Sequence, residues 1–236
     1  MRSFPIDPML CAMARVIKDD YIVTTGVASD LPMLAVALAK ATHAPGLVYF
    51  NCVGAVNPTW EHLPNSSVEP DLLPAEAFIR LEEIWEMASR GRIDLMFFGA
   101  IQIDARGRTN LHRLDTGYKL PGIAGASTMR RKVKRAILYS TRHTTSTFVP
   151  KVDVITTTPR PGDSAIAITP AAVLCLAPNG ARIESLLPSY RADMVQEQTG
   201  FELSWNDQLE TLPPPNTREL TALQQLDPKG SRKRFL

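Results

Sequence analysis

The sequence predicts an α/β fold: an open, mostly parallel sheet flanked by helices, with an antiparallel β extension. Two observations lead to this prediction. Short apolar runs alternate with segments of helical periodicity through the first hundred residues, which is the pattern of right-handed strand–helix–strand crossovers. Beyond that point, short β-like runs are separated by Gly- and Pro-rich turns, which favours antiparallel pairing. The chain has 236 residues, enough to bury a large core without disulfides or metal.

The first half supplies the alternating elements. Asp30 is placed to cap a helix that is almost wholly apolar and therefore buried, and Pro32 is tolerated in its first turn. A stripe of apolar side chains from Ala77 to Ala88 predicts one long helix that starts at Pro74. In chain order we expect a helix over 8–18, a strand over 21–25, a helix over 32–42, a strand over 47–51, a helix over 74–90 and a strand over 93–98.

The second half is predicted to be mainly β. Arg106 and Gly107 form a turn signal between two β-like runs, which predicts a hairpin. A Gly- and Pro-rich loop is expected over 119–126. The Pro-rich stretch Leu212–Pro215 is the candidate boundary, but the segment after it is too short for a domain, so we expect one domain over 1–236. The remaining predictions are strands over 101–104, 109–111, 136–140, 152–156, 165–169, 171–176 and 181–186, and helices over 190–200 and 217–226.

Composition excludes several classes of protein. With 44% hydrophobic residues and a net charge of +2, the chain is too apolar for a disordered protein and too balanced for a nucleic-acid binder. The cysteines Cys11, Cys52 and Cys175 form no CxxC pair, which argues against a disulfide scaffold and against a zinc site. No apolar run approaches the length of a membrane span, and no signal peptide is recognisable. We therefore expect a cytoplasmic protein with no metal and no nucleic-acid or membrane partner.

The ends of the predicted parallel strands are the first place to look for a site, because ligands bind beyond the carboxyl ends of such strands. These ends lie at Gly26, at Cys52–Gly54 and from Gly99 onward. The loop over 121–128 is a further candidate, since small residues let a ligand approach the backbone and exposed N–H groups hold an anion or oxyanion. A tight turn is the alternative interpretation of that loop.

Short motifs succeed one another in a definite order along nearly the whole chain. The most specific is Phe98–Asn110, with the sequence FGAIQIDARGRTN. The others include IVTTG ending at Gly26, GIAGA over 122–126 and KVDVITTTP over 151–159. Taken in order, they resemble the beta subunit of the family I coenzyme A transferases, of the glutaconate CoA-transferase type. Ala124 replaces the middle glycine of that family's G-x-G-G-A turn.

The resemblance implies an enzyme that acts on an acyl-CoA thioester, with coenzyme A as substrate and carrier. It also implies oxyanion donors in the backbone around Gly99–Ala100 and Gly125–Ala126. Asp104 and Asn110 flank the hairpin turn and either face the ligand or only make turn hydrogen bonds. Gln102 either reaches the ligand or satisfies a strand edge. The substrate-binding or CoA-binding residues expected on this basis are Gly26, Val53, Gly54, Gly99, Ala100, Gln102, Asn110, Gly122, Gly125 and Ala126.

One position departs from the family. The resemblance places the family's nucleophilic glutamate directly after the second strand, where this chain has Cys52. A carboxylate can carry CoA to a second acid, whereas a thiolate that attacks an acyl-CoA keeps the acyl group and releases CoA. Cys52 is thus either a catalytic nucleophile for acyl transfer or hydrolysis, or a small residue at an inherited pocket. Glu61, Glu69 and Asp71 come in the next loop but do not stand at the strand end.

A second branch of the family bears on this departure. The chain is also similar to the beta chain of steroid-ring-cleaving CoA hydrolases, in which the alpha-type chain supplies the working carboxylate. That precedent implies an alpha-type partner in a heterodimer or heterotetramer. The sequence leaves several functions open: CoA transfer, hydrolysis or C–C cleavage of a CoA ester, a homomeric hydrolase that uses Cys52, or a non-catalytic ligand-binding subunit.

Other charged segments have plainer interpretations. The basic run Arg130–Arg135 is expected to be a solvated face, with the nucleotide end of CoA or an acidic partner surface as alternatives. The basic tail over 229–236 is expected to be a frayed, solvated terminus. His62 is expected to be a surface histidine and His112 a structural one, with a general base as the alternative for His112. The Thr- and Ser-rich run over 140–147, which contains His143, is expected to be a strand-to-loop edge, with a carboxylate or phosphate site as the alternative.

Overall fold

The computed structural model describes residues 3–66, 68 and 74–235. The chain divides into two compact units. Unit 1 comprises Met1–Phe97, Lys132–Arg135 and Pro215–Leu236, and unit 2 comprises Phe98–Arg131 and Ala136–Pro214. The last of these boundaries falls within the Pro-rich stretch that the sequence marks as a candidate boundary.

The sheet of unit 1 has the predicted parallel core. Its strands are β1 (Ile22–Thr24), β2 (Val48–Phe50), β3 (Ala55–Val56), β4 (Ala77–Phe78) and the first residues of β5 (Leu95–Gly99), in the order β5-β1-β2-β3-β4. β1 pairs in parallel with β2 and β5, whereas β2–β3 and β3–β4 are antiparallel. The crossover pattern read from the sequence is therefore confirmed for the three predicted strands.

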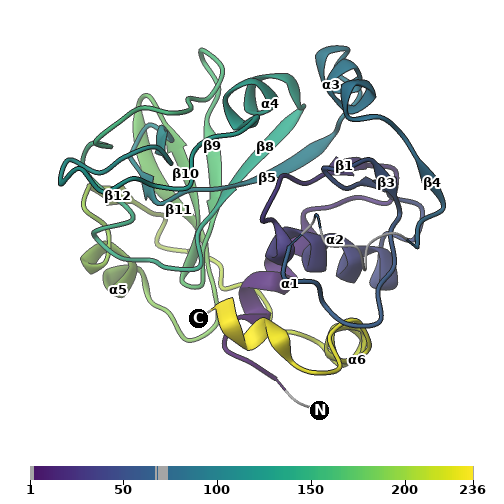
Figure 1. Cartoon of the computed structure of the whole chain (residues 1–236). Helices are drawn as coiled ribbons and strands as arrows, with labels where there is room; N and C mark the ends of the chain where they lie inside the picture. Colours follow the sequence, from purple (N-terminus) through teal and green to yellow (C-terminus); the bar gives the residue numbers. More distant parts are fainter. Residues whose placement is uncertain (1–2, 67, 69–73, 236) are drawn as a thin grey trace. The chain divides into compact units, whose positions relative to one another are not determined.

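Helices flank these strands (Figure 1). They are α1 (Asp7–Arg15), α2 (Asp30–Thr42), α3 (Leu81–Ser89), α6 (Thr217–Leu226) and a 3-10 helix (Ser231–Phe235). α2 packs against both α1 and α6, and most of its residues are buried, as its Ala- and Leu-rich sequence predicts. Within the described part of the chain, no helix combines the length and apolar character needed to cross a bilayer.

The prediction of one long helix that starts at Pro74 is wrong for the residues before Leu81. Ala77 and Phe78 instead form the edge strand β4, and the helix begins only after Arg80. The backbone N–H of Glu76 donates to Val56 O at 3.0 Å, and that of Ile79 donates to Gly54 O at 2.9 Å. Pairing with a distant strand overrides the helical periodicity here, because periodicity records only local spacing.

Unit 2 contains the antiparallel extension. Its strands are β6 (Gln102–Ile103), β7 (Thr109–Asn110), β8 (Arg135–Tyr139), β9 (Ala165–Ile168), β10 (Ala172–Ala177), β11 (Gly180–Leu186) and β12 (Leu203–Ser204). β6 and β7 form the predicted hairpin. β9, β10 and β11 are antiparallel, while β8 is parallel to β9 and β11 to β12. Two helices complete the unit, α4 (Ala126–Lys132) and α5 (Ala192–Glu197).

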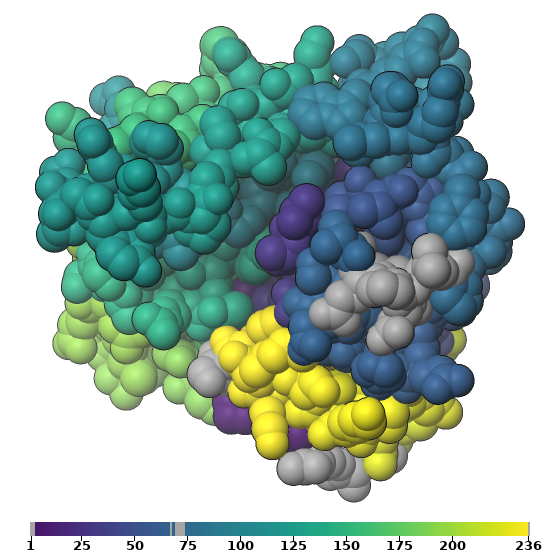
Figure 2. Space-filling view, in the orientation of Figure 1, coloured from purple at the N-terminus to yellow at the C-terminus, as the bar shows by residue number. Residues whose placement is uncertain are grey.

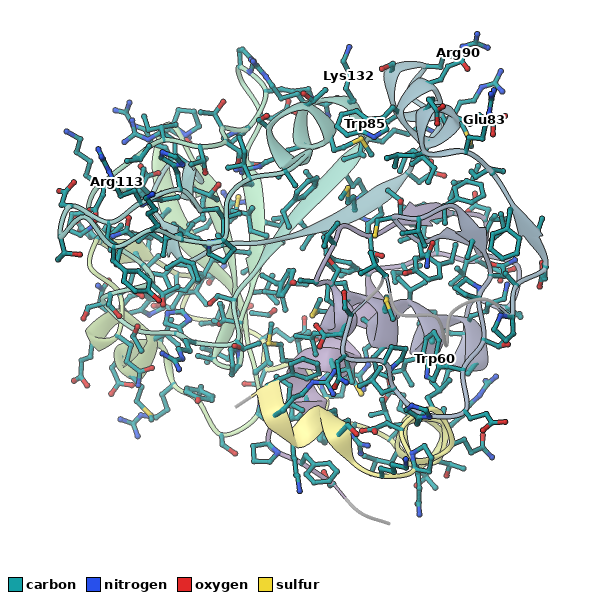
Figure 3. All side chains as sticks on the ribbon, in the orientation of Figure 1. Trp60, Glu83, Trp85, Arg90, Arg113 and Lys132 are labelled. Carbon is teal, nitrogen blue, oxygen red and sulfur yellow. The ribbon has the colours of Figure 1, made fainter. Side chains whose placement is uncertain are left out.

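Two predictions in unit 2 are corrected. The segment 152–156 is not a strand; an isolated bridge joins Thr157 to Thr109 instead. Pro159 and Pro161 come directly after it, and proline removes the N–H that a longer ladder would need. The basic run is not wholly a solvated face, because it overlaps α4 and Arg130 is only 3% exposed. Lys132 does extend to solvent, as Figure 3 shows.

The basic tail is not a frayed terminus. Arg232 is 1% exposed and donates to the carboxylates of Asp7 and Asp227 at 2.7 and 3.2 Å. A buried guanidinium is tolerated only when it is paired and hydrogen-bonded, and here both carboxylates are themselves buried. The sequence alone predicts a solvated tail, because Asp7, the partner of Arg232, lies 225 positions away in the chain.

Candidate functional site

A tight turn after β2 presents Cys52. The Oδ1 atom of Asn51 accepts hydrogen bonds from the N–H groups of Val53 (3.1 Å) and Ala55 (2.9 Å). Gly54 has φ +92°, and a Cβ atom built on it would lie 1.9 Å from Ile79 O. Glycine is the residue that can occupy such a position. The turn therefore has one backbone shape, and Cys52 is held at a defined place on it.

Two buried hydroxyl groups belong to the surroundings of Cys52 in unit 1. The hydroxyls of Tyr49 and Thr25 are buried and lie 2.7 Å apart. Burial raises the pKa of Tyr49 above its ordinary value, and the charge of a Cys52 thiolate would raise that pKa further, which places the two side chains near each other. Cys52 is half-buried, and no residue of the turn 51–55 carries a carboxylate.

Three acidic residues follow the Cys52 turn in the sequence, and the structure describes one of them. Glu61 is exposed in the loop beyond β3. Glu69 and Asp71 lie outside the described residues. The site role of Cys52 therefore stays a prediction, and the structure adds the geometry of its turn.

The end of β1 lies beside the end of β2. Thr24 is in register with Phe50, so Gly26 comes after β1 at the same step as Cys52 comes after β2. A Cβ on Gly26 would meet Ser29 Oγ at 3.5 Å and Met96 Cε at 3.6 Å, which is ordinary contact. The packing of unit 1 does not require this glycine, and close approach of a ligand remains our prediction for it. Val27 and Val53 next to these positions are 60% and 50% exposed.

In unit 2, Gln102 and Asn110 are brought together by the hairpin. Asn110 Nδ2 donates to Gln102 Oε1 at 2.8 Å and to the Arg113 carbonyl at 2.8 Å. Gln102 Oε1 also accepts from the N–H of Asp153 at 3.1 Å. Both side chains are buried, so these amide groups hold the hairpin and the next turn together. A direct role in ligand binding stays a prediction.

Three of the predicted site residues in unit 2 already donate their N–H groups to backbone carbonyls. The N–H of Ala100 donates to Tyr139 O at 3.3 Å, that of Gly122 to Leu111 O at 2.8 Å, and that of Ala126 to Ile123 O at 2.8 Å. Gly99 is closely covered, because a Cβ there would lie 3.1 Å from Tyr139 Oη. Of the four predicted oxyanion donors, Ala100 and Ala126 thus have their N–H groups bonded to backbone carbonyls, and the roles of Gly99 and Gly125 stay predictions.

Arg130 is a residue whose placement the sequence did not indicate. Its Nη1 donates to Thr157 Oγ1 at 2.6 Å and its Nη2 to Gly107 O at 2.6 Å. Burial lowers the pKa of Arg130 to about 10. This guanidinium ties α4, at the end of the glycine loop, to the hairpin that carries Gln102 and Asn110. In the sequence it is one of five basic residues in a run, and only burial distinguishes it.

Comparison with known proteins decides the family. The model of the Coenzyme A transferase family matches residues 9–198. The chain belongs to the coenzyme A transferase family. The resemblance stated from the motifs is confirmed, and with it the expectation of an enzyme of this family.

Two individual relatives of this CoA-transferase family chain are similar to it over nearly its whole length. A subunit of the 3-oxoadipate CoA-transferase of Pseudomonas knackmussii is 28% identical over 240 residues, covering 93% of this chain and 91% of that protein. A crystal structure of the decarboxylase AibA/AibB matches with 38% identity and a TM-score of 0.93, covering 98% of each chain. In four other structures of that decarboxylase, one cysteine is replaced by valine, serine, alanine or asparagine.

The fold is shared more widely. Glutaconate coenzyme A-transferase from Acidaminococcus fermentans matches with a TM-score of 0.85 at 18% identity, over 98% of both chains. This likeness confirms the predicted fold class. CoA is a substrate of the CoA-transferase family. Within residues 3–66, 68 and 74–235, no group of three or more His, Cys, Asp or Glu side chains is placed to hold a metal ion.

Proposed function

We propose that this chain is the beta-type subunit of a heteromeric enzyme that removes CO2 from a dicarboxylic acyl-CoA, with an alpha-type partner that carries the working carboxylate. The observation that carries the proposal is the turn 51–55, which presents Cys52 and no carboxylate. The chain is also 38% identical to a decarboxylase. We further propose that the chain acts as one beta-type domain over 1–236. We also propose that the protein lies in the cytoplasm, a reducing compartment, because its three cysteines are free.

The chemistry at position 52 separates the possible reactions. CoA transfer needs a carboxylate that becomes a thioester with CoA and then passes CoA on. A cysteine at that place would retain the acyl group. Transfer through this chain's own turn is therefore disfavoured, while a reaction that needs no protein nucleophile is compatible with Cys52.

Decarboxylation is such a reaction. The bond between the carboxylate carbon and its neighbour breaks, and the electron pair moves onto the thioester carbonyl oxygen to give an enolate. CO2 leaves, and the enolate carbon then takes a proton from an acid. The protein must exclude water from the carboxylate and donate hydrogen bonds to the enolate oxygen. Val27 and Val53, which come directly after Gly26 and Cys52, present exposed apolar side chains at these strand ends, and apolar surroundings favour neutral CO2 over the carboxylate.

CoA transfer is the second candidate, favoured by the family and by the 3-oxoadipate CoA-transferase relative. In that case the glutamate that carries CoA belongs to the alpha-type partner. Hydrolysis by the same pair is the remaining variant, with water in place of an acceptor acid.

One experiment separates these reactions. The chain is purified alone and together with an alpha-type chain from the same organism, and each sample receives glutaconyl-CoA with and without acetate. We expect CO2 release by the pair without acetate, little change in Cys52→Ala, and no activity of the chain alone. Mass spectrometry of the intact chains reads covalent adducts at the same time.

The other outcomes overturn the proposal in distinguishable ways. Acetate-dependent formation of acetyl-CoA, with a CoA adduct on the partner, establishes transfer. An acyl adduct on this chain that is lost in Cys52→Ser establishes a cysteine nucleophile. In Cys52→Glu we expect a CoA adduct on this chain, because a carboxylate then stands at the turn. If the two chains form no stable pair and bind no CoA ester, the whole proposal is wrong.

A further inference from the structure

The last ten described residues of the chain form a strap across unit 1. We call residues 226–235 the C-terminal strap. Its first residue, Leu226, accepts a hydrogen bond from Trp60 Nε1 at 3.0 Å, and Figure 3 shows Trp60 directed toward α6. Near its end, the guanidinium of Arg234 contacts three acceptors: Asp30 Oδ2 at 2.7 Å, Pro64 O at 2.8 Å and Asn65 Oδ1 at 3.3 Å. In Figure 2 the strap, in yellow, lies against the blue segment around residues 57–65.

The strap contacts two segments, the start of α2 and the loop 57–65, and each follows a part of the candidate site of unit 1 in the sequence. Asp30 opens α2 directly after the loop 26–29, which begins at Gly26. The loop 57–65 leaves β3, the strand that comes after the Cys52 turn and pairs with β2. One guanidinium therefore joins the first residue of α2, directly after the loop 26–29, to the far end of the loop 57–65, which follows the Cys52 turn and β3.

The loop after β1 needs such support. Ala28 has φ +53°, a left-handed conformation that is unfavourable for residues other than glycine. Ser29 precedes α2 without a side-chain cap on the helix. A strained loop of this kind keeps its shape only when surrounding contacts hold it.

The strap itself is firmly anchored. The carboxylate of Asp227 accepts the N–H groups of Ser231 at 2.8 Å and Arg232 at 2.9 Å. Arg232, two residues before Arg234, is buried against Asp7. Arg234, in contrast, is partly exposed, with 31% of its side chain accessible. The buried ion pairs fix the strap to α1, and Arg234 extends from that anchor to the two loops.

We propose that Arg234 is a positioning residue that clamps the loops 26–29 and 57–65 into the shape that binds the acyl-CoA. The proposal rests on the proposed function for its substrate. Arginine suits this place because its planar fork presents several donors at fixed angles to a carboxylate and two further oxygens. Lysine offers one point charge on a flexible stem and can satisfy the carboxylate without bridging both loops.

The test compares Arg234→Ala and Arg234→Lys with Lys233→Ala, a control at the exposed neighbouring position. Each variant is made in the full chain and studied with its partner chain. Hydrogen exchange is followed in the loops 26–29 and 57–65, and KM and kcat are measured with glutaconyl-CoA. For Arg234→Ala we expect exchange about tenfold faster in both loops and KM raised about fivefold, with kcat little changed. Arg234→Lys recovers part of both effects, and Lys233→Ala matches the unaltered protein.

Asp30→Asn separates the two halves of the clamp. It weakens only the contact to α2, so we expect faster exchange in 26–29 and little change in 57–65. Unchanged exchange in both loops of Arg234→Ala overturns the clamp, as does faster exchange spread evenly over unit 1, which marks a merely structural role. If the pair turns over no CoA ester, the proposed function fails while the exchange data still decide whether the clamp exists.

Discussion

At the scale of single residues, His143 shows how burial decides a chemical role. Its ring nitrogens contact Thr169 Oγ1 at 2.8 Å and Thr199 Oγ1 at 3.0 Å, and its ring stacks on Phe148 with centroids 4.4 Å apart. Burial lowers the pKa of His143 to about 4. It is therefore a neutral structural histidine, and it supplies no positive charge for the anion site that is the alternative interpretation of the run 140–147.

His143 makes the stability of the protein depend on pH. Its folded pKa of about 4 lies below the ordinary value near 6.5, so the unfolded chain binds a proton that the folded chain does not. The contribution of His143 to the free energy of unfolding is fully present above pH 6.5. It is lost as the pH falls from 6.5 to about 4, and the loss amounts to about 3 kcal/mol. Urea unfolding of His143→Gln from pH 7 to pH 4 should lack this component. His112→Gln, at an exposed position, should keep the slope of the unaltered protein; an unchanged slope in His143→Gln would contradict the assignment.

At the scale of elements, the turn between β2 and β3 controls where Cys52 lies. Gly54 is enclosed by Ile79, whose N–H donates to Gly54 O at 2.9 Å. The same close approach explains why Ala77 and Phe78 form a strand and do not extend α3. The edge strand β4 and the Cys52 turn thus depend on each other, although 25 residues separate Gly54 from Ile79 in the sequence.

Gly54→Ala should damage this element severely. The added Cβ would lie 1.9 Å from Ile79 O at a φ of +92°, so backbone must move in addition to adopting an unfavourable conformation. We expect a loss of more than about 3 kcal/mol of unfolding free energy, measured by urea titration. Gly91→Ala is the matched control, because Gly91 has φ +66° but no atom within 4 Å of the added Cβ, and it should lose only about 1 kcal/mol. Equal losses in the two variants would refute the steric argument.

At the scale of the whole molecule, the two ends of the chain close unit 1. Arg232 pairs with Asp7 across 225 residues of sequence, and Arg15 donates to Glu219 on α6 at 2.7 Å through both Nε and Nη2. Both contacts join α1 to the segment that returns after unit 2. Arg232 is thus part of the core of unit 1 and supports the strap that bears Arg234.

Arg232→Met should strongly destabilise the protein. It leaves the buried carboxylates of Asp7 and Asp227 without their cation, and breaking a buried pair in this way costs about 3–5 kcal/mol. Thermal and urea unfolding measure the loss. Lys233→Met, at the exposed neighbouring position, should change stability by less than about 0.5 kcal/mol. Adding Asp7→Asn to Arg232→Met removes one uncompensated charge and should restore part of the loss; a neutral Arg232→Met would refute the argument.

The alternation of strands and helices, the β6–β7 hairpin, the family and the cysteine after β2 can all be predicted from the amino-acid sequence. These are local properties, carried by spacing, turn residues and motif order. Tertiary structure alone decided that Ala77 and Phe78 form a strand, that Arg130 and Arg232 are buried, and that the N–H groups of Ala100, Gly122 and Ala126 are already engaged. Each of these depends on a partner distant in the sequence, because pairing, burial and charge compensation arise only when such segments meet.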